Sequence, residues 1–417
     1  MSVAAHPTLH VTANWKTTIG ELCDKFDGDV QTGPFGSQLH ASDYSPEGTP
    51  IAMPRDLTGG RIVCTQIARV GNEHVQRLSR HRLEVGDIVF SRRGDISRFA
   101  VVTEDEAGWL CGTGCIRIRL NCPDVDIGYL RRYLDQESIG KWLLHEAKGI
   151  TMPNLNTKIV RALPFVYPPL AEQKRIAGIL DAADVLRVKR HEALAQLDTF
   201  LQSTFVDMFG DCDRPPVSIG DPSFGDPSGF VVLGDYARLA TGHTPDREEP
   251  TYWNGAIPWI SLTDIRTLDG TVANETLQSV TEAGIKNSSA VMLPAGTVCF
   301  SRTASVGFVT VMGREMATSQ DFVNWVCGNG LDPIYLMWAL RMSRPYLLSK
   351  SSGSTHKTIY YRHAEEFQVF LPPIDLQRRF AAIVESVERQ KDRMRAHLAE
   401  LDALFASLQS RAFSGTL

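Results

Sequence analysis

Residues 167–180 read YPPLAEQKRIAGIL, and residues 371–384 read LPPIDLQRRFAAIV. The second stretch begins 204 residues after the first, and the match continues without a gap to Phe209 and Phe413. Each double proline marks the start of a helix, because proline fits the first helical turn but stops a helix from extending backward. Apolar residues then recur at spacings of three and four with charged residues between them, which is typical of an amphipathic helix. The sequence therefore predicts two long helices, over residues 171–209 and 375–413.

The duplication extends upstream of both helices. Thr32-Gly33 matches Thr241-Gly242, and residues 86–92 (GDIVFSR) match residues 296–302 (GTVCFSR). Between the copies, glycine, proline and aspartate are concentrated, which favours an exposed linker. The chain is predicted to comprise five segments: a globular domain (1–166), a helical region (167–210), a linker (211–229), a second globular domain (230–370) and a second helical region (371–417).

Within the globular domains the pattern is mixed. Short β-branched or alternating runs predict strands at 61–67, 87–91, 99–102 and 116–120, and helical spacing covers 126–146 and 332–349. The predicted fold class is α+β, with two small mixed α/β domains related by a pseudo-two-fold internal duplication. A single amphipathic helix of this length would more often cover its own domain. Two equal helices can instead form an antiparallel coiled-coil spacer between the domains, each about 60 Å long for roughly 38 residues.

Charge is distributed unevenly along the sequence. The 417 residues carry a net charge of −5 with a pI near 6.1, so the overall charge gives no argument for nucleic acid. Residues 55–98, however, hold nine arginines against five acids, and residues 341–362 hold five lysines or arginines and no acid. Each copy therefore contains a basic segment.

Several classes of protein are disfavoured by composition. The eight cysteines include no Cys-x-x-Cys pair, which predicts reduced thiols and no metal site. No apolar stretch reaches the roughly 20 residues of a membrane helix, and the first residues lack a signal-peptide pattern. We expect a cytoplasmic protein without a membrane partner.

Arginine interleaved with serine, threonine, asparagine and aromatic residues suits contacts to DNA phosphates and base edges. Arg92 and Arg302 rank first, because the same Phe-Ser-Arg sequence ends a predicted strand in both copies. For any other single arginine, a solvated surface position is the alternative. The candidate DNA-binding residues are Arg92, Arg93, Arg98, Lys148, Asn154, Thr241, His243, Thr244, Tyr252, Trp253, Arg302, Gln320, Lys350, His356 and Lys357, with the loops 32–38, 241–253 and 350–357 around them.

Several stretches carry a resemblance to a known family. They read PPLAEQKRIA (168–177), LGD (233–235), TGHTP (241–245), YWNGAIPWI (252–260) and LFASLQSRAFSG (404–415). In this order, and duplicated, they make the chain resemble the specificity subunits (HsdS) of type I restriction-modification systems over essentially its whole length. The first domain departs from the pattern, with TGPFGS at 32–37 where the second has Gly-x-Thr-Pro.

The resemblance implies that the globular domains are target recognition domains, each reading one half of a split sequence in double-stranded DNA. It also implies that the helices dock methyltransferase subunits (HsdM), which restriction subunits (HsdR) join. S-adenosylmethionine, ATP and magnesium are expected on those partner subunits, and no cofactor on this chain. The candidate partner-binding residues at the helix starts are Gln173, Arg175, Ile176, Gln377, Arg379 and Phe380.

The sequence contains no catalytic constellation. Neither the phosphate loop G-x-x-x-x-G-K-[S/T] nor a G-x-G-x-x-G after a strand occurs. Glu146 and Lys148 could form the carboxylate–lysine part of a nuclease, but the second copy has Lys350-Ser351-Ser352 in that place, without an acid. We therefore predict a non-catalytic subunit. Two alternatives stay open: a self-contained DNA-acting enzyme, and a coiled-coil adaptor for protein partners without DNA specificity.

Overall fold

The computed structural model describes residues 16–36, 38–63, 66–147, 153–210, 215–219, 229–353 and 357–417. The chain forms two compact units. The first comprises the chain up to Arg190 together with His397–Leu417, and the second comprises His191–Ala396. This division passes through both long helices, and the bounds of the five segments stay a prediction. Each unit holds one globular domain and a portion of both helices.

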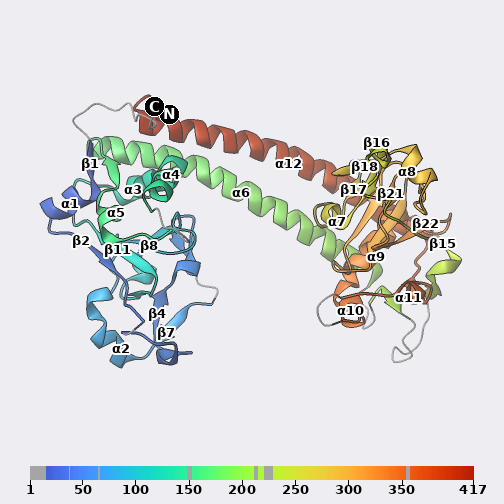
Figure 1. The fold of residues 1–417 in the computed structure, drawn as a ribbon, viewed down its shortest axis with the longest axis horizontal. Helices are drawn as coiled ribbons and strands as arrows, with labels where there is room; N and C mark the ends of the chain where they lie inside the picture. Colours follow the sequence, from blue (N-terminus) through green and yellow to red (C-terminus); the bar gives the residue numbers. More distant parts are fainter. Residues whose placement is uncertain are drawn as a thin grey trace. The chain divides into compact units, whose positions relative to one another are not determined.

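An antiparallel four-stranded sheet lies at the centre of the first unit (Figure 1). Its order is β2-β11-β8-β9, with β2 at Asp29–Thr32, β8 at Ile88–Ser91, β9 at Phe99–Val101 and β11 at Cys115–Arg119. All four residues of β8 are buried, as expected for a short apolar run in a sheet interior. The remaining described strands of this unit are β10 (Leu110–Cys111), β4 (Thr49–Ala52), β7 (Ala68–Val70) and β3 (Tyr44–Ser45) in a second sheet, the pair β1 (Lys16–Thr18) and β12 (Pro164–Val166), and the pair β5 (Leu57–Thr58) and β6 (Arg61–Ile62).

Short helices lie around the sheets of the first unit (Figure 1). They are α1 (Ile19–Lys25), α2 (Asn72–Arg77), α3 (Ile127–Leu134), α4 (Glu137–Glu146) and α5 (Thr157–Arg161), with 3-10 turns at Ala41–Asp43, Pro54–Asp56, Ser79–His81 and Glu104–Glu106. Asp126 caps α3 by accepting the amide proton of Tyr129 at 2.9 Å. The buried Tyr129 hydroxyl donates to the carbonyl of Val166 at 2.8 Å, which ties α3 to β12.

The second unit repeats this plan. Its central sheet has the order β15-β22-β19-β20-β17, so the first four strands correspond to β2-β11-β8-β9. The Tyr335 hydroxyl of α9 donates to the carbonyl of Phe370 at 2.6 Å, repeating the bond between Tyr129 and Val166. The strands are β15 (Ala237–Thr241), β17 (Val272–Ala273), β19 (Thr297–Ser301), β20 (Val309–Met312) and β22 (Phe322–Cys327), then β16 (Trp253–Ile260), β18 (Gln278–Val280) and β21 (Ala317–Thr318), and finally β13 (Val217–Ile219), β14 (Phe230–Val232) and β23 (Phe367–Phe370).

The shorter helices of the second unit follow the same order along the chain. They are α7 (Leu262–Leu268), α8 (Glu282–Lys286), α9 (Pro333–Met342), α10 (Arg344–Ser349) and α11 (Tyr361–Ala364), with 3-10 turns at Leu233–Asp235 and Pro250–Tyr252. The helical pattern over 332–349 is thus divided between α9 and α10, just as the pattern over 126–146 is divided between α3 and α4.

The two long helices are α6 (Leu170–Phe209) and α12 (Ile374–Ser414), within one residue of the predicted bounds. Within the first unit, Arg187 of α6 donates to Asp402 of α12 at 2.6 Å, and Arg190 is hydrogen-bonded to His397 at 2.7 Å. The partner's number falls as the α6 number rises, so the helices run antiparallel.

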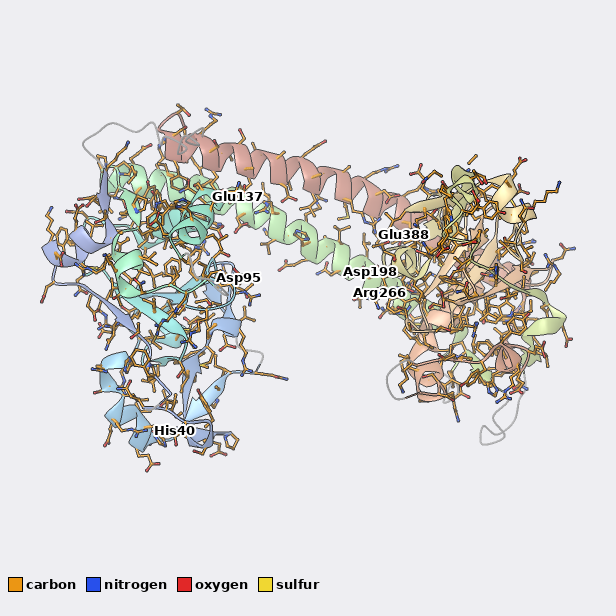
Figure 2. The ribbon with its side chains drawn as sticks, viewed as in Figure 1. His40, Asp95, Glu137, Asp198, Arg266 and Glu388 are labelled. Atoms are coloured by element: carbon orange, nitrogen blue, oxygen red, sulfur yellow. The ribbon has the colours of Figure 1, made fainter. Side chains whose placement is uncertain are left out.

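Within the second unit, the α6 residue Asp198 accepts from Lys391 of α12 at 2.7 Å (Figure 2 labels Asp198). The rings of Phe205 and Phe380 meet farther along, with centroids 5.3 Å apart. The same antiparallel pairing therefore occurs in both units. Together with the duplicated mixed α/β domains, it confirms the predicted fold class.

Each hydrophobic core draws on both helices. The first core contains Ile176 and Leu180 of α6 with Phe413 of α12, and the second contains Phe205 of α6 with Phe380 of α12. Burying these side chains stabilises each unit by roughly 1.5–3 kcal/mol per large apolar residue. The long helices are therefore integral parts of both cores.

Candidate nucleic-acid interface

Arg92 and Arg302 follow equivalent strands and share one backbone framework. The carbonyl of Arg92 accepts the amide proton of Leu155 at 2.9 Å, and the carbonyl of Arg302 accepts that of Ile359 at 2.8 Å. In both copies the arginine carbonyl is thus bonded to a residue that lies about 60 positions later in the chain. The two residues that rank first in the sequence occupy the same position in each domain.

In the second domain, three candidate residues lie together. The guanidinium of Arg302 donates twice to the carbonyl of Gln320, from Nε at 3.2 Å and from Nη2 at 2.8 Å. The Gln320 side-chain oxygen accepts from the Thr244 hydroxyl at 2.6 Å. Gln320 is exposed, whereas Arg302 and Thr244 are half-buried. The predicted site is therefore a connected polar cluster with the Gln320 amide at its surface.

In the first domain, Arg92 is held differently. Its Nε donates to the side-chain oxygen of Asn154 at 3.2 Å and to the carbonyl of Leu155 at 3.1 Å. Its guanidinium lies 5.6 Å from the ring centroid of Phe35, a side chain that is 53% exposed. An exposed phenylalanine beside a fixed arginine is a candidate for contact with the apolar parts of a base.

The Thr-Gly repeat aligns these two clusters. Starting from Thr32-Gly33 and Thr241-Gly242, the residue equivalent to Phe35 is Thr244. A β-carbon at Gly33 would overlap the carbonyl oxygen of Gly112, and one at Gly242 would overlap the side chain of Thr318, so both loops need glycine at this position. The sequence analysis included the loop 32–38 but did not list Phe35 among the candidate residues. The alignment of the two Thr-Gly pairs is the signal that could have identified Phe35.

The loop after β15 carries further candidates. The amide of His243 donates to Thr318 at 2.9 Å, and its carbonyl accepts from the indole of Trp259 at 3.2 Å, while its side chain is exposed. The carbonyl of Tyr252 accepts the amide proton of Thr281 at 3.0 Å, and the Tyr252 side chain is half-buried. His243 therefore presents a side chain to solvent from a fixed backbone.

The remaining candidate residues differ in their exposure and in their contacts with other side chains. Arg93, Asn154, Thr241, Lys350 and Lys357 are exposed, and Arg98 pairs with Asp95 at 3.2 Å. The Lys350 ammonium lies 5.5 Å from the ring centroid of Tyr346. Lys148 and His356 lie outside the described residues.

Part of the second basic segment is turned toward the protein. Arg344 donates to both carboxylate oxygens of Asp269 and to the carbonyl of Gly307. Arg341 lies 3.8 Å from the same carboxylate and 4.5 Å from the ring centroid of Trp338, and burial lowers its pKa. These arginines stabilise α9 and α10 against the sheet, so they are poor candidates for DNA contact.

The candidate partner-binding residues divide by exposure. Gln173 is fully buried and bonds the carbonyls of Pro168 and Asp124 and the amide of Asp126. Gln377 is equally buried and forms the same kind of bonds at the start of α12. Ile176 and Phe380 belong to the cores. These four side chains fix each helix to its own domain, and partner contact stays a prediction for the exposed Arg175 and Arg379.

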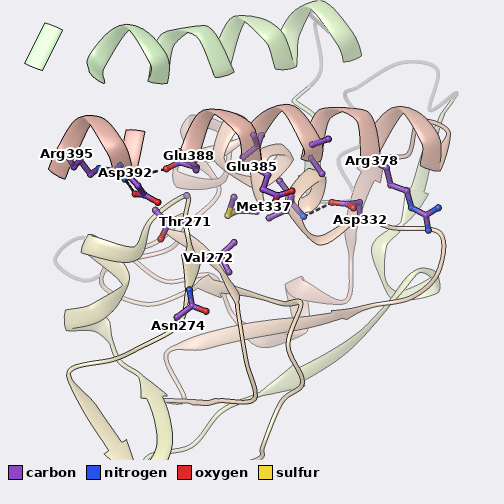
Figure 3. A pocket seen from close by; sticks show the side chains of 15 residues that line it. Thr271, Val272, Asn274, Asp332, Met337, Arg378, Glu385, Glu388, Asp392 and Arg395 are labelled. Carbon is purple, nitrogen blue, oxygen red and sulfur yellow. Dashed lines mark hydrogen bonds and ion pairs between the residues drawn. The ribbon is translucent and has the colours of Figure 1, made fainter. Parts of the chain in front are cut away.

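A groove of about 620 Å³ lies beneath α12 in the second unit (Figure 3). Glu385, Glu388 and Asp392 line it from the helix, with Thr271 and Asn274 on the opposite wall. Arg378 and Arg395 are its two arginines, against four carboxylates including Asp332. An excess of acid repels phosphate, which disfavours contact between this groove and the DNA backbone.

Two further properties concern the described part of the chain as a whole. Its histidine, cysteine and carboxylate side chains form no cluster of three or more that could hold a metal ion. None of its helices combines the length and the apolar character needed to cross a membrane.

The fold and the site define a class of protein: a tandem of two mixed α/β domains, each with an arginine-centred polar cluster and each followed by a long helix. Residues 16–196 and 226–403 match the family described as the type I restriction modification DNA specificity domain. The two matches cover most of the chain. The protein belongs to this family.

Two relatives from Methanocaldococcus jannaschii are similar in sequence. The putative type I restriction enzyme MjaX specificity subunit is 22% identical over 392 residues, which cover 89% of each chain. The type I restriction enzyme MjaIX specificity subunit is 26% identical over 154 residues, so the match spans about a third of that relative, 36% of each chain. A chain in a structure of the type I R-M system, described by its complex assembly and conformational transition, shares the fold with a TM-score of 0.57 at 18% identity, over 96% of this chain and 98% of that one.

Proposed function

We propose that this chain is the specificity subunit of a type I restriction-modification complex and that each globular domain reads one half of a split target in double-stranded DNA. The observation that carries the proposal is the repeated site, in which Arg92 and Arg302 stand on the same framework in two copies of one domain. Two equivalent readers on one chain suit a target with two half-sites, as in dimeric repressors. The different neighbours of the arginines, Phe35 and Thr244, suit two different half-site sequences.

The proposal includes partners that supply the chemistry. Several large apolar side chains on the long helices are exposed, which supports a protein partner that would bury them. They are Val185, Leu186, Val188 and Phe200 of α6 and Leu404 of α12. We infer that methyltransferase subunits dock on these helices and that restriction subunits join them. S-adenosylmethionine, ATP and magnesium would then belong to those subunits, and this chain would recognise DNA without catalysing a reaction.

The test is to express this chain with the methyltransferase subunit of its own system and to map adenine methylation in the host DNA. Methylation at one split motif, lost when this chain is omitted, is the expected result. Methylation that persists without this chain would contradict the proposal.

Two further outcomes point to the alternatives. Methyl transfer or cleavage by the purified chain alone would identify a self-contained enzyme. A complex with the methyltransferase subunit that has no affinity for duplex DNA, at low or at physiological salt, would identify an adaptor for protein partners.

A further inference from the structure

The loop between β15 and β16 holds an arginine that the candidate set omits. The guanidinium of Arg247 lies 5.0 Å from the ring centroid of Trp253 and 5.4 Å from that of Trp259. The two indoles meet edge to face, with centroids 5.1 Å apart and an interplanar angle of 88°. Trp259 is buried, whereas Arg247 is exposed. The paired tryptophans therefore hold an exposed guanidinium by cation–π attraction.

The same tryptophans fix the backbone that carries Arg247. The Trp253 indole donates to the carbonyl of Asp246 at 2.8 Å, and the Trp259 indole donates to the carbonyl of His243 at 3.2 Å. Both indole N–H groups thus bind the loop within four residues of the arginine. The side chain and its backbone are positioned before any ligand arrives, which lowers the entropic cost of binding.

The guanidinium is held without using its hydrogen-bond donors. Among the described residues, no carboxylate pairs with Arg247 and no acceptor takes its N–H groups; its recorded contacts are the two rings. By contrast, Arg302 donates to Gln320 from Nε and Nη2, and Arg344 is bonded to Asp269. Within the described part of the chain, Arg247 therefore has all five N–H donors available, whereas Arg302 retains only some of its own.

The position of Arg247 connects it to the candidate site. It follows Thr244 by three residues, and Thr244 is bonded to Gln320. A planar guanidinium with a free donor edge matches O6 and N7 of guanine in the major groove, the commonest specific contact of arginine to DNA.

We propose that Arg247 reads a guanine in the half-site recognised by the second domain, and that Trp253 and Trp259 are its positioning residues. This inference rests on the proposed function and adds a specificity-determining residue to it. Nothing in the local sequence marks Arg247, because its stacking on Trp259 depends on how the loop folds back on β16.

The test uses the complex of this chain with its methyltransferase subunit and duplexes that carry the mapped target. Arg247→Ala is expected to weaken binding of the target about 10-fold or more and to abolish discrimination at one guanine. That guanine lies in the half-site whose recognition Arg302→Ala also weakens. Methylation mapping in cells would show the same position becoming degenerate.

Matched variants separate positioning from simple loss of charge. Trp253→Leu removes both the stacking ring and the indole N–H and should reproduce part of the loss at the same guanine. Trp253→Phe keeps a ring beside the guanidinium but not the bond to Asp246, and should retain more of the discrimination than Trp253→Leu. Arg238→Ala removes an exposed arginine on β15 of the same domain and should leave the motif unchanged.

Three results would overturn the inference. One is unchanged affinity and motif in Arg247→Ala. Another is a loss of affinity equal for all duplexes with a salt slope lowered by about one, which identifies a phosphate contact. The third is a second-domain half-site that contains no guanine. Absence of specific binding by the wild-type complex would instead overturn the proposed function itself.

Discussion

Lys391 of α12 donates a hydrogen bond of 2.7 Å to Asp198 of α6, and its side chain is only 8% exposed. It also pairs with Glu388 at 2.6 Å. In the first unit, Arg187 pairs in the same way with Asp402 and Asp184. The residues of the two clusters match with an offset of 204 positions: Arg187 corresponds to Lys391, Asp184 to Glu388, and Asp198 to Asp402. The ion cluster between the helices is therefore itself duplicated.

Lys391→Met should destabilise the second unit by about 1–2 kcal/mol. The substitution leaves two carboxylates without their shared cation, but Asp198 is 54% exposed, so the cost falls between those of surface and buried pairs. Thermal unfolding of the purified chain measures it. Lys391→Arg supplies the side chain that the first unit uses and should restore the midpoint. An unchanged midpoint in Lys391→Met would show that the cluster contributes nothing.

The Thr-Gly loops give a second stability prediction. Gly242→Ala and Gly33→Ala should each cost about 1–3 kcal/mol, because the added methyl group overlaps Thr318 or the carbonyl of Gly112 and the backbone must shift. Chemical unfolding tests this. Gly36→Ala is the matched control, since a β-carbon there meets nothing within 4 Å. Equal unfolding midpoints for all three variants would contradict the prediction that a β-carbon at Gly33 or Gly242 clashes with its neighbours.

The polar cluster of the second domain predicts a binding effect. Arg302→Ala should weaken binding of the target duplex by about 1–3 kcal/mol if Arg302 contacts a base. Thr244→Val removes the hydroxyl that bonds Gln320 and should produce a smaller loss in the same half-site. Titration of the complex with labelled duplex measures both. Full affinity in Arg302→Ala would remove this residue from the interface.

In the first domain, Phe35 predicts an effect on the other half-site. Phe35→Ala should lower affinity and relax the requirement for a thymine, because an exposed ring beside Arg92 suits contact with the thymine methyl group. Phe35→Leu keeps apolar surface and should retain more of the preference. Methylation mapping would show which half of the motif becomes degenerate. A change confined to the half-site of the second domain would refute the assignment.

The long helices could be predicted from the sequence because their signals are local. Double prolines and an apolar stripe located α6 and α12 to within one residue. The repeat also predicted that Arg92 and Arg302 occupy equivalent positions, which the structure shows. Gln173 and Gln377 likewise recur at the helix starts, where both form buried bonds to their own domain.

Contacts between distant segments could not be predicted in this way. Arg344 forms an ion pair with Asp269, which lies 75 residues away in the sequence. The orientation of Arg247 depends on its contact with the ring of Trp259. Of the strand predicted over 61–67, Arg61–Ile62 form β6, and residues 64 and 65 lie outside the described part of the chain. The sequence shows how many charged and apolar residues a segment contains. Tertiary packing determines which of these side chains are exposed.

Buried His81 predicts acid sensitivity of the first unit. Its side chain is 2% exposed, and burial, followed by the charges of Arg80 and Arg117, lowers its pKa from 6.5 to about 4. Its Nε2 accepts from Arg80 at 3.3 Å, which requires the neutral ring. The unfolded chain takes up a proton near pH 6.5 but the folded chain resists it, so the free energy of unfolding should fall as pH drops from about 6.5 toward 4.

Chemical unfolding of the chain between pH 7.5 and pH 4 would measure this loss. Carboxylates titrate in the same window, so the relevant quantity is the difference between wild type and His81→Gln. That variant should start from a lower free energy of unfolding at pH 7.5 and lose less of it on acidification, since no imidazole remains to be protonated. His40→Gln, at an exposed position in the same unit, should follow the wild-type profile. Parallel profiles for wild type and His81→Gln would show that burial of His81 does not couple protonation to folding.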